Sequence, residues 1–179
     1  MAAQTIVIGH VALIQLSKRQ DFVLDVIAEL RKQGFDAIGI FAGECRETEY
    51  MIELKQKVNV LGLEHCALFL GRRNDIPDLL KMIDILMIPS FEGFPLAGLE
   101  AAAAGVSVVA CNAAGAREFI EVSGAGRMFV EGDIYQAVTA VVSAYQDREN
   151  LCKNGECFAQ KMAMQTYRQH IAEQFRICQ

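Results

Sequence analysis

The chain has 179 residues, the size of one ordinary domain, and 53% of them are of apolar type. With 22% charged residues and three prolines, the composition is that of a folded globular protein and excludes a disordered or low-complexity chain. The formal net charge is −5, and no run of lysines and arginines stands out. We therefore expect no nucleic-acid partner and no binding to an anionic lipid surface.

The six cysteines show no C-x-x-C spacing and have no nearby histidine, so we predict no metal site and interpret them as reduced thiols. The first ten residues lack the basic segment of a secretory signal. The longest weakly polar stretch, 95–116, is interrupted by Glu100 and rich in small residues, unlike a membrane span. We expect a cytoplasmic protein without a transmembrane segment.

Short apolar, β-branched segments alternate with segments whose apolar residues recur at helical spacing, which predicts alternating strands and helices. The first predicted strand is 5–13, and the helix after it begins with Ser17 and Gln20 as a capping box and ends at Gly34. Strand 36–43, helix 47–61 and strand 65–71 follow, and then a helix that Asn74 caps and that has Pro77 in its first turn. The remaining elements are strand 85–90, helix 95–104, strand 106–111, helix 113–121, strand 127–130, and helices 133–145 and 149–175.

The predicted strands are apolar on both faces and are separated by helices, which is typical of a parallel sheet covered on both sides. We predict one α/β domain over 1–179, with a doubly wound, Rossmann-like parallel sheet of about six strands. Ligands of such sheets bind outside the carboxyl ends of the strands. The first strand is not followed by G-x-G-x-x-G or by a Walker A loop, which disfavours nicotinamide cofactors and P-loop chemistry.

The loop after the fourth predicted strand is the most informative one. Gly93 permits a tight turn and Pro95 stands where the next helix begins. The backbone N–H groups of Phe94, Leu96 and Ala97 would then point out of the positive end of the helix. This arrangement binds a phosphate without any basic side chain.

Two glutamates lie on either side of this helix start. Glu92 precedes the helix, and Glu100 lies about 7.5 Å beyond Pro95 along its axis, at roughly 1.5 Å per residue. A diphosphate ester over the helix end would place one attached sugar near Glu92 and another near Glu100. The spacing alone is common by chance, and a solvated loop residue with an exposed helix residue is the alternative interpretation.

In its setting of strand, P-S-x-E-G-F, helix start, L-E-A and the strand VSVVA, the segment 84–110 resembles the donor-binding core of family 4 of the retaining, nucleotide-sugar-dependent glycosyltransferases. The resemblance implies that Glu92 and Glu100 form the family's E-x7-E element. Glu92 would be the catalytic residue, holding hydroxyl groups of the donor sugar and stabilising positive charge at its anomeric carbon. Glu100 would accept hydrogen bonds from the nucleotide ribose, and Gly93, Phe94, Pro95 and Leu96 would hold the diphosphate.

The resemblance extends over nearly the whole chain. Lys18 is similar to the family's lysine that meets the donor phosphates. The stretch from Leu70 through Arg72, with Asp75 and Ile76, is similar to the loop that meets the nucleobase; Gly115 and Glu118 match a downstream G-x-x-E. Two positions depart from the family pattern: Leu13 stands where an arginine is usual, which removes one phosphate contact, and Ser107 replaces a usual proline.

The family's fold implies that this chain is the C-terminal, nucleotide-sugar-binding half of a GT-B enzyme. The N-terminal domain, which builds the acceptor site, would be absent from the chain. The implied activity is retaining transfer, by a front-face mechanism, from a nucleotide-diphosphate sugar of UDP or GDP type to a saccharide or glycolipid. A lipopolysaccharide or other surface polysaccharide is the acceptor class expected. The resemblance implies no cofactor and no metal, and for the full-length protein a location in the cytoplasm or at the periphery of the inner membrane.

Two other functions fit the same residues. A lone donor domain with Leu13 in place of arginine would serve as a non-catalytic nucleotide-binding or interaction module, and a sugar-nucleotide epimerase would use a similar scaffold. Several single residues also have structural interpretations. Lys18 would be a helix-surface residue, Arg72 and Arg73 a solvated pair, Glu118 a packing or capping residue, and His10 a buried, hydrogen-bonded histidine.

Overall fold

The computed structural model describes residues 5–91, 93 and 95–177. Within these residues, six strands form one sheet in the order β3-β2-β1-β4-β5-β6, and every pair of neighbouring strands is parallel. The strands are β1 (Ile6–Val11), β2 (Ala37–Ala42), β3 (Ala67–Gly71), β4 (Ile85–Ile88), β5 (Ser107–Cys111) and β6 (Gly126–Phe129). The prediction of a doubly wound α/β sheet of about six strands is confirmed.

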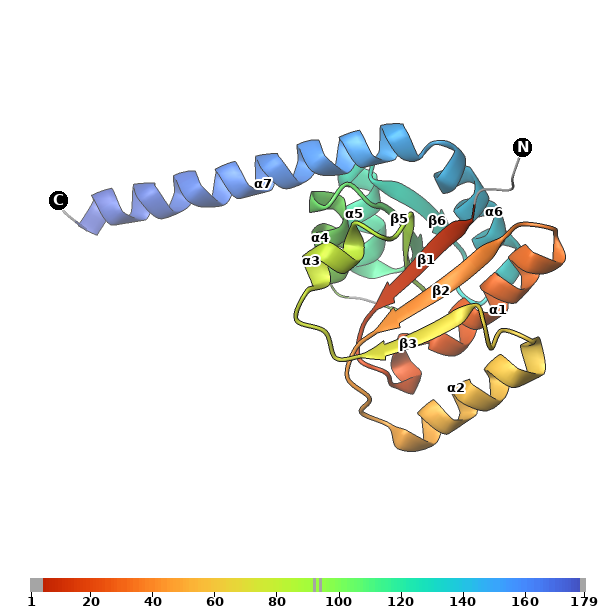
Figure 1. Ribbon diagram of the computed structural model, residues 1–179. Helices are drawn as coiled ribbons and strands as arrows, with labels where there is room; N and C mark the ends of the chain where they lie inside the picture. The colour runs from red at the N-terminus through yellow and green to blue at the C-terminus, as the bar shows by residue number, and fades with distance from the viewer. Residues whose placement is uncertain (1–4, 92, 94, 178–179) are drawn as a thin grey trace.

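Helices cover both faces of the sheet (Figure 1). They are η1, a 3-10 turn (Leu16–Lys18), α1 (Gln20–Lys32), α2 (Thr48–Leu61), α3 (Ile76–Leu80), α4 (Leu96–Ala103), α5 (Ala114–Ser123), α6 (Ile134–Gln146) and α7 (Arg148–Ile177). One buried cluster joins α1, α2 and α6 to the sheet, and a second joins α3, α4 and α5 to its other face. The far end of α7 extends beyond the rest of the molecule in Figure 1.

The strand β4 shows why the sheet needs two layers of helices. Ile85 and Met87 belong to one buried cluster, and Leu86 and Ile88 belong to the other. Successive side chains of a strand point to opposite faces, so an apolar run of four residues buries both faces. Each such side chain contributes about 1.5–3 kcal/mol when it is removed from water.

The strand order reverses between β1 and β4, since β1 continues to β2 on one side and β4 to β5 on the other. The loops that follow β1 and β2 lie in close contact at the carboxyl ends of these strands, where the N–H of Ala12 donates to the carbonyl oxygen of Ala42 at 3.0 Å. A Cβ atom at Gly43 would lie 1.7 Å from the carbonyl oxygen of Ala12, so this close approach requires glycine. The crevice beside β1 and β4 is where ligands of doubly wound sheets bind.

The predicted capping residues are wrong. Ser17 lies inside the turn η1, and α1 begins at Gln20 after Arg19, whose φ of 57° is left-handed. Gln20 is fully buried, and its side-chain amide donates to the backbone of the loop after β1 instead of to the helix end. For α3 the capping position belongs to Asp75 rather than Asn74, without a side-chain hydrogen bond. Sequence spacing identified the helices but not the residues that satisfy their ends.

Candidate functional site

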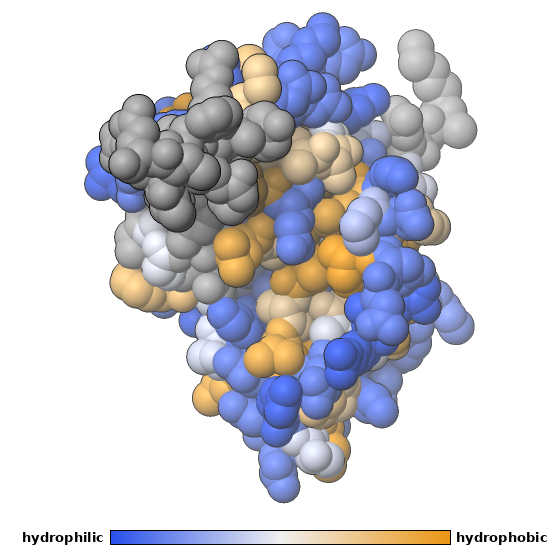
Figure 2. Space-filling view, turned by 90° about the vertical axis from the view of Figure 1, so that its left-hand side faces the viewer, coloured by the Kyte–Doolittle hydropathy of each residue, from blue (hydrophilic) through white to orange (hydrophobic). Residues whose placement is uncertain are grey.

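A cavity of about 300 Å³ opens at the carboxyl ends of β1 and β4. The residues along its wall come from the end of β1 and the loop after it, from the segment after β4 and from the start of α4: His10, Leu13, Lys18, Ser90, Pro95, Leu96 and Ala97. The arrowheads of β1, β2 and β3 in Figure 1 point to the side that Figure 2 turns to the viewer, where hydrophobic residues lie among hydrophilic ones. The wall of this cavity brings together three of the predicted binding residues, Lys18, Pro95 and Leu96.

The first turn of α4 presents backbone N–H groups at this cavity. Pro95 is the residue before the helix and makes no side-chain cap, and the first helical hydrogen bond runs from the N–H of Leu99 to the carbonyl oxygen of Pro95 at 3.1 Å. The N–H groups of Leu96, Ala97 and Gly98 therefore have no partner within the helix. Together with the positive end of the helix dipole, they form a site suited to an anion.

Lys18 reaches the cavity from a short turn. It is the last residue of η1, and its backbone N–H donates to the carbonyl oxygen of Gln15 at 2.9 Å. The buried amide of Gln20 donates to the carbonyl oxygen of Leu13 at 2.9 Å and so holds the loop that brings both Leu13 and Lys18 to the wall. A cationic side chain and a helix N-terminus thus face one space.

His10 is buried, as predicted, and it also contributes to the cavity wall. Its Nδ1 lies 2.9 Å from the carbonyl oxygen of Met87 on β4. Because a carbonyl oxygen only accepts, Nδ1 carries the proton and donates this bond. Sequence reasoning considered that His10, which follows Gly9, could approach a ligand but favoured a buried structural role, and it missed Ser90 as a wall residue. Their positions at the ends of β1 and β4 were the available signal, since side chains there face the ligand edge of the sheet.

A second cavity, of about 360 Å³, lies between α3 and α4. Its wall brings together Ile76 and Glu100, two of the predicted binding residues, with the apolar side chain of Leu80 and the amine-bearing side chain of Lys81. Glu100 is exposed on α4. The same helix thus carries an anion-binding end at one cavity and a carboxylate at the other.

Arg72 is exposed directly after β3 and is absent from the described residues that line these two cavities. Its neighbour Arg73 is not simply solvated, because its Nε donates to Oδ1 of Asp75 at 2.8 Å. This hydrogen bond holds the pKa of the Asp75 carboxyl below its ordinary value and raises that of the Arg73 guanidinium. The pair shapes the turn between Arg72 and Ile76.

The other predicted residues are distributed as follows. Gly93 is exposed and has open space around it. Gly115 is buried in α5, whereas Glu118 is exposed on that helix. Glu92 and Phe94 lie outside the described residues, so their predicted roles stay predictions.

A third and larger cavity, of about 510 Å³, lies between β6 and α6. None of the predicted binding residues lies among the described residues of its wall, and its arginine, Arg127, donates to Asp147 at 2.6 Å and to Ser143 at 3.3 Å. Across the described part of the chain, no group of three or more histidine, cysteine or acidic side chains is placed to hold a metal ion. In the same part of the chain, no helix is long and apolar enough to cross a membrane.

The two cavities differ in the chemistry that they offer to a ligand. In the first, the N-terminus of α4 and Lys18 favour a negatively charged group such as a phosphate. In the second, the carboxylate of Glu100 can accept hydrogen bonds from hydroxyl groups beside the apolar wall that Ile76 and Leu80 supply.

Comparisons with known proteins match the chain to a protein family and to solved structures. Residues 5–147 match the family model of glycosyl transferases group 1. The chain is 30% identical over 149 residues to the lipopolysaccharide core biosynthesis mannosyltransferase of Rhizobium meliloti (strain 1021), covering 80% of this chain and 42% of that protein. Across the curated relatives that it matches, the chain spans between 24% and 42% of their length.

Solved structures with the same fold include one with a bound nucleotide. The Anabaena protein HepE in complex with UDP superposes with a TM-score of 0.84 at 29% identity, covering 96% of this chain and 49% of that one. The C-terminal domain of a glycosyl transferase group 1 family protein from Francisella tularensis superposes with a TM-score of 0.77 at 26% identity, covering 87% of this chain and 85% of that one.

Proposed function

Because the chain belongs to the glycosyl transferases group 1 family, we propose that it is the donor-binding domain of a retaining glycosyltransferase and binds a nucleotide-diphosphate sugar. One observation carries the proposal: α4 has an anion-binding end and Lys18 at one cavity, and Glu100 at another. A uridine nucleotide is the donor type that we propose, since HepE, 29% identical to this chain, was solved in complex with UDP.

The diphosphate would lie over the first turn of α4. The N–H groups of Leu96, Ala97 and Gly98 would donate to its oxygens, and Lys18 would add a charge-assisted hydrogen bond from the opposite wall. This pairing of dipole and cation would stabilise the leaving group as its bond to the sugar breaks.

The nucleoside would occupy the second cavity. Glu100 would accept hydrogen bonds from the ribose hydroxyl groups, and Ile76 with Leu80 would supply apolar contact. Arg72, at the rim after β3, would meet the nucleobase. Two hydrogen bonds from ribose to a carboxylate are worth about 1.5–3 kcal/mol each, enough to make Glu100 the most sensitive single residue of the site.

The sugar would lie beside the loop after β4, where Glu92 would hold its hydroxyl groups and Gly93 would allow close approach. In the transfer step, the bond between the anomeric carbon and the diphosphate oxygen breaks, and its electron pair goes to the diphosphate. The acceptor hydroxyl oxygen bonds to the anomeric carbon on the same face, and its proton passes to the departing phosphate oxygen. Glu92 would stabilise the positive charge that develops on the sugar.

A saccharide or glycolipid acceptor, read by an N-terminal domain, belongs to the same proposal. Its support is the lipopolysaccharide-related relative and the length comparison, because this chain covers 42% of that protein but 85% of a structure described as a C-terminal domain. The acceptor-binding residues would then lie on the part of the enzyme that this chain does not contain. We propose a cytoplasmic location for the whole enzyme, at the periphery of the inner membrane.

Nucleotide binding tests the proposal. Calorimetric titration of the chain with UDP, GDP and ADP should show binding of UDP, and Glu100→Ala should weaken it by about tenfold or more, since a charged hydrogen-bond acceptor is lost. Glu53→Ala is a matched control, because Glu53 is also an exposed helix glutamate but lies on α2. If no nucleoside diphosphate binds at millimolar concentration, or if both variants behave alike, the proposed site is wrong.

A further inference from the structure

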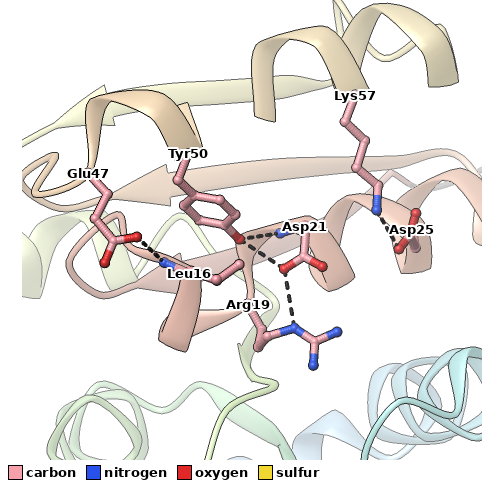
Figure 3. A network of polar contacts seen from close by, with 7 residues as sticks. All are labelled: Leu16, Arg19, Asp21, Asp25, Glu47, Tyr50 and Lys57. Carbon is pink, nitrogen blue, oxygen red and sulfur yellow. Dashed lines mark hydrogen bonds and ion pairs between the residues drawn. The ribbon is translucent and has the colours of Figure 1, made fainter. Parts of the chain in front are cut away.

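We propose that Tyr50 and Glu47, which lie at the start of α2, are positioning residues that hold Lys18 where it meets the donor diphosphate. This inference rests on the proposed function, because it assigns to Lys18 the phosphate contact described above. Figure 3 shows the contacts that carry it.

The hydrogen bond from Gln20 to Leu13 holds the loop before the turn that carries Lys18, but no side chain caps the turn itself. η1 is three residues long, and neither η1 nor α1 has a side-chain cap at its start. The residue that joins them, Arg19, has a φ of 57°, the single positive φ among the described non-glycine residues. Such a conformation costs about 1–3 kcal/mol and persists only where surrounding contacts impose it.

Contacts from α2 hold the chain on both sides of Lys18. Two residues before it, the N–H of Leu16 donates to Oε2 of Glu47 at 2.9 Å. Three residues after it, the N–H of Asp21 donates to the hydroxyl oxygen of Tyr50 at 3.0 Å, and this hydroxyl donates to Oδ1 of Asp21 at 2.9 Å. The carboxylate of Glu47 and the hydroxyl of Tyr50 thus accept from backbone N–H groups that a side-chain cap would otherwise satisfy, and they impose the strained turn between Leu16 and Asp21.

Tyr50 is suited to this role because its ring is buried and its hydroxyl stays protonated. Its side chain is 5% exposed. Burial, the largest cause, raises the pKa of its hydroxyl well above the ordinary value. At neutral pH the hydroxyl therefore both accepts from the backbone and donates to Asp21. Tyr50 and Glu47 are absent from the described wall of the Lys18 cavity, so they would act through the turn and not on the ligand.

The same two helices share a second contact that has no connection with Lys18. Nζ of Lys57, about two turns after Tyr50 along α2, lies 2.6 Å from Oδ2 of Asp25 on α1. Figure 3 shows this pair apart from the cluster at the turn. A merely structural role for Tyr50 would make the two contacts equivalent, whereas a positioning role makes only the Tyr50 contact matter for ligand binding.

The test measures UDP affinity by calorimetry for Tyr50→Phe, Lys57→Met, Lys18→Ala and the double variant Tyr50→Phe/Lys18→Ala, with thermal unfolding in parallel. We expect Tyr50→Phe to weaken binding by about three- to tenfold and Lys57→Met by less than about twofold. In the Lys18→Ala background, Tyr50→Phe should have no further effect, because its contribution passes through that lysine. Equal effects of Tyr50→Phe and Lys57→Met, or a full effect without Lys18, would overturn the inference.

A second pair of variants keeps the test decisive if Tyr50→Phe does not fold. Glu47→Gln retains an oxygen that accepts from Leu16 and should keep the affinity of the parent chain, whereas Glu47→Ala should lower it. If both bind UDP like the parent, the inference fails. If Lys18→Ala itself binds UDP normally, the phosphate role of Lys18 in the proposed function fails, and the positioning role falls with it. Normal binding by Tyr50→Phe alone rejects only the inference.

Discussion

Leu13 is an uncharged residue in the wall of the cavity at the carboxyl ends of β1 and β4. It shares the wall with Lys18, and its side chain is 39% exposed. Its backbone is held in place, since its carbonyl oxygen accepts a hydrogen bond from the buried side-chain amide of Gln20. A new side chain at position 13 would therefore change the charge of the cavity without moving the loop.

Leu13→Arg is expected to tighten UDP binding. A second cation beside the diphosphate should add about 1 kcal/mol, or roughly fivefold in affinity, at low salt, and the gain should shrink as salt is added. Leu16→Arg is the control, because Leu16 is also exposed and close in sequence but is absent from the described cavity wall. Titration at two salt concentrations measures both. An equal gain in the two variants would mean that overall charge, and not the position of residue 13, governs binding.

At the scale of elements, the sequence predicted the sheet and its covering helices better than the contacts at helix ends and between helices. Apolar runs such as 85–88 fill both faces of the sheet, so their pattern alone indicates a covered parallel sheet. The start of α1 was not predictable in this way, because Ser17 and Gln20 resemble a capping box while long-range contacts from α2 satisfy the helix end. The juxtaposition of Ile76 and Glu100 likewise depends on how α3 packs against α4, which no local pattern records.

A hydrogen-bonded carboxylate at the end of α6, that of Asp147, is expected to make the stability of the fold depend on pH. Nη2 of Arg127 on β6 donates to Oδ2 of Asp147 at the end of α6 at 2.6 Å, and Nδ2 of Asn150 donates to the other carboxylate oxygen. The hydrogen bond from Asn150, followed by that from Arg127, lowers the pKa of the Asp147 carboxyl below its ordinary value.

We expect this carboxylate to stabilise the fold above pH about 4, the ordinary value for aspartate, and to lose its effect as the pH falls through its lowered folded-state pKa. The sign follows because the unfolded chain binds the proton more readily than the folded one. Thermal unfolding of the parent chain and of Asn150→Ala between pH 5 and pH 2.5 measures it. The difference in melting temperature between the two proteins should shrink toward the acid end. A difference that is constant with pH would contradict the assignment to Asp147.

At the scale of the whole molecule, the cavity proposed to hold the donor diphosphate lies at the carboxyl ends of the central strands. The cavity beside β1 and β4 opens at an edge of the sheet where Leu13, Leu16, Phe91 and Leu96 are exposed. Transfer also needs an acceptor hydroxyl held near the anomeric carbon and the exclusion of water from the reacting groups. The described residues are proposed to contact a donor, whereas the curated relatives are more than twice as long as the part that this chain matches.

Donor binding and turnover should therefore separate in this chain. We expect it to bind UDP and UDP-sugars while releasing no UDP from them above the rate of the buffer, with or without saccharide acceptors. The measurement is a coupled assay for UDP release, run on protein whose nucleotide binding has been verified by calorimetry, with Glu100→Ala as the variant that should neither bind nor release. Transfer of sugar to an acceptor by these 179 residues would show that the chain holds a complete acceptor site. Binding without turnover would instead support an acceptor site built by residues other than these 179.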